Sequence, residues 1–163
     1  MIYEDLVVIK KHLTRDKIQN PVVEIGSRIV TSHSEYNLKV RKMFKGFEYY
    51  GVDIFTGNNV DLLGDAEHLP FKSNSIGTLI SIGVLEHLQQ FWVAMEEFYR
   101  VLKKGCYLFI ATVFNFPVHG NPDYWRFAPE GLSYLVRKFE DAMVVGEGKI
   151  KDSPKGIYVI AKK

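Results

Sequence analysis

The stretch "GTLISIGVLEHLQQFWVAMEEFYRVLKKGCYLFIATVF", residues 77–114, indicates the fold because it holds two apolar runs with a long amphipathic segment between them. The first run, residues 77–85, is apolar enough to be a strand buried on both faces, as strands of a parallel sheet are. Residues 86–103 place seven apolar or aromatic side chains on one broad helical face. The second run, residues 106–114, is another buried strand. This order predicts two parallel strands joined by a crossover helix.

The rest of the chain extends this alternation in both directions. Because strand and helix alternate through the first five strands, we expect a parallel sheet with helices on both faces. The connection between the last two strands, residues 147–155, is short and polar, so these strands are expected to form an antiparallel hairpin. The predicted fold class is α/β, a doubly wound, Rossmann-like, mostly parallel sheet of seven strands with an antiparallel last strand. The further expected strands are residues 22–25, 47–54, 58–64, 141–148 and 156–163, and the further helices are residues 2–18, 35–44 and 129–139.

The composition is that of one ordinary globular domain. At 163 residues we expect a single domain, residues 1–163, with an N-terminal helix in residues 1–20 and the core in residues 21–163. A hydrophobic content of 47% and a charged content of 25% exclude a disordered or fibrous chain. A net charge of +2 does not favour a nucleic-acid partner, because dedicated nucleic-acid binders carry a stronger basic excess on one face.

Cysteine content and hydropathy indicate the cellular compartment that we expect for the protein. Cys106 is the only cysteine, so neither an intrachain disulfide nor a cysteine metal cluster can form, and its apolar neighbours indicate a buried core thiol. The N-terminal segment "MIYEDLVVIKKHL" is too charged for a signal peptide, and no apolar run approaches membrane-spanning length. We therefore expect a cytoplasmic protein with no membrane partner.

Candidate binding residues follow the expected strands. In open α/β sheets, ligands bind beyond the carboxyl ends of the strands, near the point where the strand order reverses. Asp53 closes the second strand and can accept two hydrogen bonds from a ribose diol, although a turn cap is an equally good interpretation. Asp65, in "GDAEHLPF", can recognise the edge of an adenine, or it can be an N-cap or turn residue.

Six segments in fixed order carry a family resemblance. They are "VVEIGS", "YYGVDI", "GDAEHLPF", "SIGVLEHL", "EEFYRVLKKGCYLFIATVF" and "NPDYWRFAPEGLSYLV". Together they resemble the class I S-adenosylmethionine-dependent methyltransferases, and most closely the small branch often called type 11. The similarity runs from about Val22 to Phe139. It implies a seven-stranded sheet with an antiparallel last strand, S-adenosyl-L-methionine as cofactor and S-adenosyl-L-homocysteine as product.

The resemblance also implies a cofactor site. Glu24, Gly26 and Ser27 fall in the first motif, where the chain passes close to the methionine part of the cofactor. Only a residue without a Cβ atom lets the backbone approach so near. Asp53 matches the acid that binds the ribose hydroxyls, and Ile54 matches the apolar residue beside the adenine.

The next two motifs complete this implied site. Asp65 and Ala66 match the pair that recognises the adenine edge. Ile82 and Gly83 line the methionine side of the cofactor. Residues 86–87, Glu-His, are expected to open the helix next to the site of methyl transfer.

The loop after the first strand departs from the family pattern. The family usually has a second and often a third glycine after Gly26, and those positions here hold Arg28 and Val30. Because S-adenosylmethionine has no pyrophosphate, a full anion cradle is not required. Two hypotheses therefore stand: an active methyltransferase, and a non-catalytic domain that binds a partner or senses the cofactor. A nicotinamide-dependent oxidoreductase ranks low, because its glycine fingerprint is missing.

Methyl transfer requires the protein mainly to position the two reacting groups. The reaction is an in-line displacement that depends on holding the nucleophile and the methyl group in near-attack geometry, so neither a metal site nor a covalent nucleophile is predicted. A general base helps only when the acceptor is a hydroxyl or a protonated amine. His87 and His119 are the candidates, because imidazole titrates near neutral pH. For each histidine taken alone, a structural or solvent-facing role is favoured.

The segment "FNFPVHGNPDYWRFAPEGL", residues 114–132, is the best candidate for binding the methyl acceptor. Its Asp123, Tyr124, Trp125 and Arg126 can wall a pocket, or equally they can anchor the loop, with Arg126 paired to Asp123. No Asn/Asp-Pro-Pro-aromatic sequence, typical of enzymes that methylate nucleic-acid amines, follows the fourth strand. We therefore expect a small-molecule or glycan-type acceptor, and we keep open a protein partner or a homodimer.

Overall fold

Seven strands form one mixed sheet in the computed structural model, which describes residues 2–30, 34–150 and 153–163. Their spatial order is β3-β2-β1-β4-β5-β7-β6. The first five strands along the chain pair in parallel, and β7 pairs antiparallel with both β5 and β6. The mostly parallel sheet with an antiparallel last strand is therefore confirmed. The strands are β1 (Val22–Ile25), β2 (Tyr49–Asp53), β3 (Leu62–Leu63), β4 (Ile76–Ile82), β5 (Leu102–Val113), β6 (Glu140–Ile150) and β7 (Ser153–Lys162).

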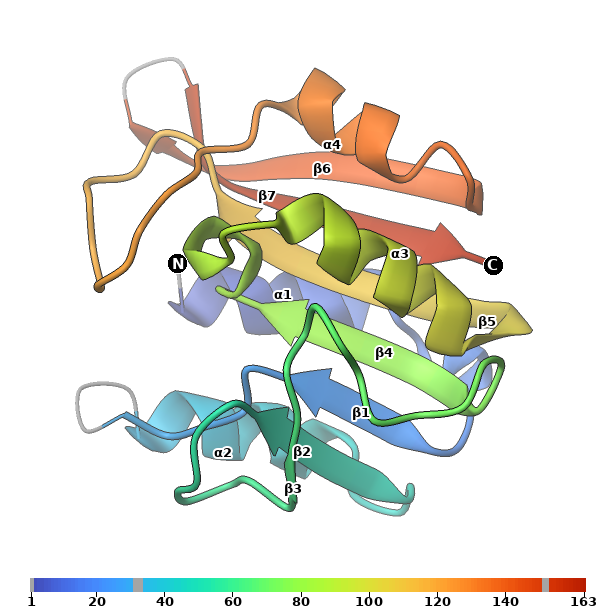
Figure 1. Ribbon diagram of the computed structural model, residues 1–163. Helices are drawn as coiled ribbons and strands as arrows, with labels where there is room; N and C mark the ends of the chain where they lie inside the picture. The colour runs from blue at the N-terminus through green and yellow to red at the C-terminus, as the bar shows by residue number, and fades with distance from the viewer. Residues whose placement is uncertain (1, 31–33, 151–152) are drawn as a thin grey trace.

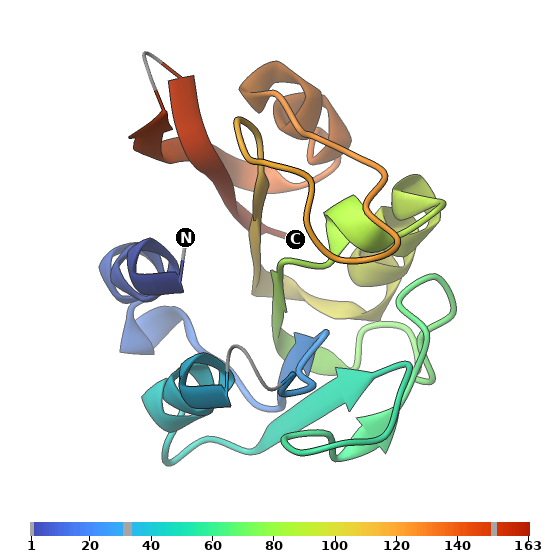
Figure 2. The same ribbon diagram turned by 90° about the vertical axis from the view of Figure 1, so that its left-hand side faces the viewer.

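Helices cover both faces of this sheet, as Figures 1 and 2 show. On one face lie α1 (Ile2–His12) and α2 (Ser34–Met43), and on the other lie α3 (Phe91–Val101) and α4 (Pro129–Leu135). Each face has its own core, because β1, β4 and β5 send alternate side chains to opposite sides. The doubly wound architecture is thus confirmed. None of the helices in the described ranges has the length and apolar character needed to cross a bilayer.

The central segment behaves largely as its sequence predicts. In β4, every residue from Ile76 to Ser81 is buried, because the strand lies between β1 and β5 and under helices on both faces. Helix α3 buries its apolar stripe against the sheet, while Trp92 remains 48% exposed. Cys106 is buried within β5, as expected.

Several element boundaries differ from the sequence prediction: α4 ends at Leu135, β3 is limited to Leu62–Leu63, and most of the expected polar connection, residues 147–155, lies within β6 and β7. Helix α3 begins at Phe91, so Glu86 and His87 do not open it; they lie in a separate 3-10 turn, η3 (Leu85–His87). The N-terminal helix ends at His12, and a 3-10 turn, η1 (Arg15–Lys17), follows it. Strand β5 begins at Leu102, because it pairs there with β4 before a register shift, so the following "KKG" belongs to the strand.

The alternation of strand and helix also fails in one place. The segment 54–75, which links β2 to β4, contains turns and the short β3 but no helix. Hydrogen bonds from this segment to α3 replace the cover that a helix would give, since Leu69 N donates to Glu97 Oε2 at 2.8 Å. The buried side chain of Leu69 anchors the same loop in the core.

The carboxyl ends of the parallel strands meet at one edge of the sheet, which Figure 2 views end-on. The order reverses between β1 and β4, because the chain builds outward from β1 to β2 and β3 and then returns to β4 and β5. A long loop, residues 114–128, leaves the end of β5 and crosses beside η3 before α4 begins (Figure 2). We call it the β5–α4 loop. It places residues from distant parts of the sequence beside the switch point.

Candidate functional site

The predicted ribose-binding acid, Asp53, closes β2 and also caps the turn that follows. Its Oδ1 accepts a hydrogen bond from Phe55 N at 3.0 Å, and its Oδ2 accepts one from Arg28 N at 3.3 Å. The Arg28 guanidinium approaches the same carboxylate, with 3.7 Å between Nε and Oδ1. The turn-cap interpretation is confirmed, and the arginine at the unusual position of the first loop contacts this acid.

An exposed apolar surface adjoins Asp53. Ile54 is 60% exposed and Phe55 is 61% exposed, and the Arg28 guanidinium lies 5.1 Å from the centre of the Phe55 ring. Exposed apolar side chains beside a carboxylate form a surface on which a base can stack while the acid holds a sugar hydroxyl. Ile54 was predicted for such a role, whereas Phe55 was not named.

Gly26 occupies a backbone position that other residues rarely adopt, with φ of +76°. A Cβ atom built there would lie 2.3 Å from Cγ2 of Val84, so the close approach in this structure is made by Val84. Ser27 is fully buried, and its hydroxyl donates to the carbonyl oxygen of Asn59 at 3.0 Å. The single glycine is therefore required by packing as well as by backbone geometry.

Glu24 is buried inside β1. The hydroxyl of Tyr49 donates a short hydrogen bond to its Oε2, and Arg41 of α2 stacks on the Tyr49 ring. Burial raises the pKa of the Glu24 carboxyl to about 7, because the charged form loses its hydration, and the Tyr49 hydrogen bond only partly opposes this shift. The side chain is thus tied to β2 and lies close to α2.

Asp65 and Ala66 lie in a tight turn after β3. The Asp65 Oδ1 accepts from Glu67 N at 2.9 Å, and its Oδ2 lies 3.7 Å from Nδ1 of the exposed His68. Ala66 is buried under this turn. Asp65 therefore fills the turn-residue role that its sequence allowed. Leu69 fixes the turn against the core.

Ile82 and Gly83 end β4 at the switch point. Gly83 has φ of +64°, and a Cβ atom there would meet only Oε1 of Glu86, at 3.7 Å. Ile82 is half-buried against the core on the α1 and α2 side. Space beside Gly83 is therefore bordered by the Glu86 carboxylate, which was expected next to the site of methyl transfer but was given no catalytic or binding role.

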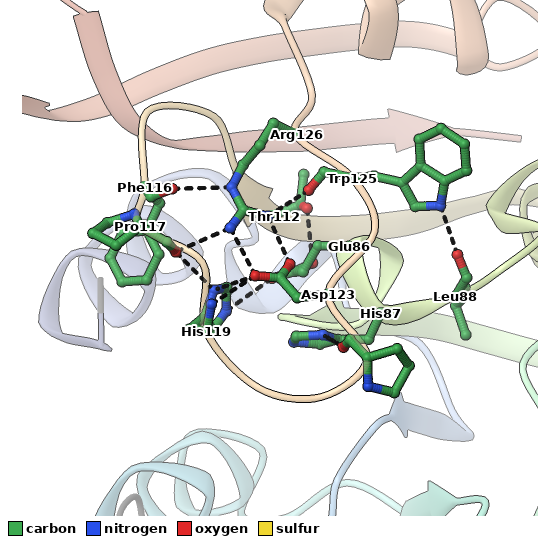
Figure 3. Close-up of polar contacts among 11 residues, drawn as sticks. Glu86, His87, Leu88, Thr112, Phe116, Pro117, His119, Asp123, Trp125 and Arg126 are labelled. Carbon is green, nitrogen blue, oxygen red and sulfur yellow. Dashed lines mark hydrogen bonds and ion pairs between the residues drawn. The ribbon is translucent and has the colours of Figure 1, made fainter.

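Glu86, His87 and His119 come together at this point, as Figure 3 shows. The Glu86 side chain is 0% exposed, and its Oε2 accepts a hydrogen bond from the Thr112 hydroxyl at 2.8 Å. Burial raises the pKa of Glu86, because the charged form is desolvated. The two imidazole rings meet edge to face with centroids 5.1 Å apart. Both candidate bases therefore face one another, although they are far apart in sequence.

A second network holds the β5–α4 loop in place (Figure 3). Asp123 and Arg126 form a two-point ion pair, with 2.6 Å and 2.7 Å between their nitrogen and oxygen atoms. The Arg126 guanidinium also donates to the carbonyl oxygens of Phe116 and Pro117. Hydrogen bonds from Arg126 and from the His119 backbone hold the pKa of Asp123 well below its usual range. The predicted pairing of Arg126 with Asp123 is confirmed.

The aromatic residues of this loop have different roles. The indole nitrogen of Trp125 donates to the Leu88 carbonyl oxygen at 2.8 Å, and its ring packs edge to face on Phe91. The Tyr124 backbone nitrogen donates to the Glu86 carbonyl oxygen at 2.8 Å, but its side chain is half exposed. Trp125 is thus an anchor, while the Tyr124 side chain is available at the surface.

Comparison with a family model gives a match over part of the chain. Residues 33–110, from α2 into β5, match Methyltransf_11, described as a methyltransferase domain. The matched range begins after the loop that departs from the family pattern. No curated protein sequence matches the chain.

Solved structures resemble the whole fold. A Thermotoga maritima S-adenosylmethionine-dependent methyltransferase, described as a possible histamine N-methyltransferase, has a TM-score of 0.73 at 20% identity, covering 99% of this chain and 89% of its own. Phosphoethanolamine N-methyltransferase 2 of Haemonchus contortus, in complex with phosphomonomethylethanolamine and S-adenosylhomocysteine, has a TM-score of 0.72 at 15% identity, covering 99% of this chain and 53% of its own. A Haloferax volcanii putative methyltransferase in complex with the Trm112 activator has a TM-score of 0.62 at 16% identity, covering 98% and 93%.

These comparisons agree with the architecture and with the enzyme class expected from the sequence. Identities of 20% or less show a shared fold, and the family model adds the type of domain. A methyltransferase domain of this type implies S-adenosylmethionine as the cofactor, as expected. Residues 33–110 therefore match the type 11 methyltransferase domain model, and the whole chain has the fold seen in solved S-adenosylmethionine-dependent methyltransferases.

Proposed function

We propose that this chain is a cytoplasmic methyltransferase that passes a methyl group directly, by in-line displacement, to a small-molecule or sugar-type acceptor. The observation that carries the proposal is that Asp53, Gly83 and the Glu86–His87–His119 cluster all lie at the carboxyl ends of the parallel strands β2, β4 and β5, on one edge of the sheet. This edge is where open α/β sheets bind their ligands. A cofactor on the β2 side and an acceptor on the β4 side would meet at the switch point.

The residues on the β2 side fit the adenosine half of S-adenosylmethionine. Asp53 would hold the ribose hydroxyls, with Ile54 against the adenine and Asp65 and Ala66 at its edge. The exposed apolar side chains beside Asp53 support this assignment. When bound, S-adenosylmethionine supplies an electrophilic methyl group on a positively charged sulfur. Binding requires Arg28 to give up its contact with the Asp53 carboxylate.

Glu24, Gly26 and Ser27 have a supporting role in this proposal. They shape the turn between β1 and the cofactor, since the buried Ser27 hydroxyl and the positive φ of Gly26 fix its path. Ile82 and Gly83 border the methionine side, where the absence of a Cβ atom at Gly83 leaves room next to Glu86.

The acceptor would lie beside His87 and His119, under the β5–α4 loop. A neutral imidazole that donates from Nδ1 keeps a lone pair on Nε2, which can take the proton of an acceptor hydroxyl or ammonium group. Asp123, Trp125 and Arg126 hold the loop, and the half-exposed Tyr124 side chain can contact the acceptor. The small phosphorylated amine in the Haemonchus contortus complex supports a small acceptor.

A non-catalytic domain is the second candidate function. It is favoured by Arg28, which stands against the ribose-binding acid, and by Val84, which occupies the space next to Gly26. A domain whose cofactor site is filled by its own side chains can still serve as a partner of another protein. The Haloferax volcanii neighbour in complex with an activator supports an assembly of this kind.

Titration calorimetry with S-adenosylmethionine, S-adenosylhomocysteine and NAD separates these functions. The methyltransferase proposal expects micromolar binding of the first two compounds and none of NAD. Asp53→Ala should weaken that binding at least about tenfold, since it removes a charge-assisted hydrogen bond to the ribose. Asp16→Ala, at an exposed carboxylate of η1, is the matched control and should leave affinity unchanged. If neither compound binds at millimolar concentration, the enzyme proposal is wrong and the second candidate stands.

A further inference from the structure

One carboxylate oxygen in the buried cluster has no hydrogen-bond partner. Glu86 Oε2 accepts from Thr112, but Oε1 accepts no hydrogen bond from the described residues. Its nearest ionisable neighbour is Nε2 of His119, at 3.9 Å. A buried carboxylate oxygen without a partner costs free energy, so the arrangement calls for a positively charged group at this position.

The hydrogen bonds of the two histidines fix which nitrogen carries the proton. Nδ1 of His87 lies 2.6 Å from the carbonyl oxygen of Pro122, and Nδ1 of His119 lies 3.2 Å from that of Pro117. A carbonyl oxygen only accepts, so Nδ1 must donate in both rings. Each neutral imidazole then keeps an unprotonated Nε2 with its lone pair available.

The cluster therefore holds an unpartnered carboxylate oxygen beside two histidines that each keep an unprotonated Nε2. One ligand atom from each of Glu86, His87 and His119 lies within 4.8 Å of the other two. We propose that these three side chains bind a divalent transition-metal ion, of which Zn²⁺ is the best match. Two imidazoles and one glutamate are a known set of protein ligands for zinc with an open fourth position, and nitrogen donors disfavour Mg²⁺ and Ca²⁺.

The surroundings supply the outer contacts that such a site needs. Ligating histidines donate their other nitrogen to a carbonyl or carboxylate oxygen, which fixes ring orientation. His87 does so to Pro122, and His119 does so to Pro117, with the Asp123 carboxylate 3.4 Å from the same nitrogen. Thr112 holds the non-ligating oxygen of Glu86. All three side chains are thus oriented by groups outside the proposed site.

Metal binding requires a modest contraction of the cluster. With bonds of about 2.0–2.2 Å, the ligand atoms of a tetrahedral zinc ion lie about 3.3–3.6 Å apart. The present separations are at most 4.8 Å, so the largest must shorten by up to about 1.5 Å. His119 lies on the β5–α4 loop beside Gly120, which has φ of +72° and lies close to the His87 ring, so a small shift of this part of the loop would change the separation of the two rings.

The position of the ion suggests its use. It would lie at the end of β4, next to Gly83, and its open position would face the space assigned to the methyl acceptor. A metal ion there would hold an acceptor oxygen and lower its pKa, so both histidines would act as ligands and not as bases. This role rests on the proposed function, whereas the binding of the ion does not.

The test is metal binding by the tag-free full chain, without cofactor. We expect one Zn²⁺ per chain, measured by calorimetry after chelator treatment, and a cobalt-substituted protein with visible absorption bands from a nitrogen- and oxygen-ligated ion. His119→Ala and Glu86→Gln should each weaken Zn²⁺ binding at least about 100-fold, since loss of even an outer contact costs 10–100-fold. His68→Ala, at an exposed histidine paired with Asp65, is the matched control and should bind as wild type.

Several outcomes would overturn the proposal. One is a folded wild-type chain that binds neither Zn²⁺ nor Co²⁺ with a Kd of about 100 μM or below. A proton or a water molecule would then occupy the space beside Glu86. Another is binding that His119→Ala leaves within threefold of wild type, roughly the scatter between such titrations. Because Glu86→Gln alters the core, the His119→Ala variant decides if the former fails to fold. Zn²⁺ binding without binding of S-adenosylmethionine would reject the proposed function alone.

Discussion

The two halves of the carboxyl edge are held together in different ways. On the cofactor side, Asp53 is contacted by Arg28, whose side chain is 36% exposed and whose Nε lies 3.7 Å from Oδ1 of Asp53. On the acceptor side, the Asp123 side chain is 2% exposed and bonded at two points by Arg126, which also holds two carbonyl oxygens of the loop. The Arg28 side chain thus makes a long ion pair with Asp53, whereas Arg126 belongs to a network of short contacts built into the loop.

This difference separates what the fold needs from what a ligand can displace. A partly exposed ion pair contributes at most about 1 kcal/mol, so a ligand that bonds Asp53 can replace Arg28 at little cost. A buried charge that loses its partner costs several times more. We therefore expect changes on the acceptor side to alter stability and changes on the cofactor side to alter affinity. The predictions below test that division, starting with the largest effect.

Arg126→Ala should destabilise the fold by about 3 kcal/mol, because it leaves the Asp123 carboxylate buried without its cation and frees two loop carbonyls. Urea denaturation measures the loss. Arg137→Ala is the matched control, since Arg137 only stacks on and bonds to Tyr134, and it should cost less than about 1 kcal/mol. Equal losses in the two variants would contradict a built network.

The same pair predicts a pH dependence. Arg126 holds the pKa of Asp123 below its unfolded value, so the native state releases this proton more readily than the unfolded chain. The stabilisation is complete above the unfolded pKa, about 4, and is lost as the pH falls below it. Wild type should therefore lose more stability than Arg126→Ala between about pH 5 and pH 3. Parallel curves would show that Asp123 is not responsible.

Glu24 should give the wild-type protein a pH dependence of stability opposite in sign to that of Asp123, and Glu24→Gln tests it. Burial raises the pKa of Glu24 to about 7, so the native state binds more protons than the unfolded chain between about pH 4.5 and pH 7. Wild-type stability should fall as the pH rises through this window, by roughly 2–3 kcal/mol. The glutamine variant should show a smaller fall, because only the contribution of Glu86, whose pKa is also raised, remains, while Glu48→Gln, at an exposed acid bonded to Tyr50, should keep the whole fall. Denaturation midpoints of the wild type and both variants, measured at pH 5 and pH 7.5, test this prediction.

The sequence predicted the fold because the information is local and periodic. Burial on both faces shows as a continuous apolar run in β4, and the stripe of α3 recurs at helical spacing. The start of α3 was wrong for a reason outside the segment. Glu86 and His87 look like the first turn of a helix, but Thr112 of β5 holds the Glu86 side chain in the core and a 3-10 turn results.

The candidate site shows the same limit. Sequence reasoning named His87 and His119 separately, but nothing local indicates that the β5–α4 loop brings them together beside Glu86. Pairing of Arg126 with Asp123 was foreseen, since the two lie three residues apart. The contact of Arg28 with Asp53 was not foreseen, because it joins the ends of two strands. Contacts between distant segments depend on the folded sheet and have no periodic signal.

Arg28→Gly should strengthen binding of S-adenosylhomocysteine by up to about fivefold. The variant places a glycine where the resembling family usually has one. It also removes the Arg28–Asp53 ion pair, which competes with the ligand for Asp53 and stabilises the free protein by at most about 1 kcal/mol. Calorimetry compares it with Arg15→Gly, at an arginine stacked on Phe47 away from this edge, which should bind as wild type. Weaker binding by Arg28→Gly would mean that Arg28 contacts the ligand and that the cofactor half is already formed.

Trp125→Phe should have the smallest effect on stability, and it tests most directly whether the acceptor side and the cofactor side are independent. It keeps an aromatic ring against Phe91 and loses the hydrogen bond to the Leu88 carbonyl oxygen, a cost of about 1 kcal/mol in urea denaturation. Trp92→Phe, at the half-exposed neighbour, should cost less. Because Trp125 holds only the acceptor side, its loss should leave S-adenosylhomocysteine affinity within about twofold of wild type. A larger change in affinity would show that the β5–α4 loop and the Asp53 side respond as one unit, so stability and ligand binding could no longer be assigned to separate halves.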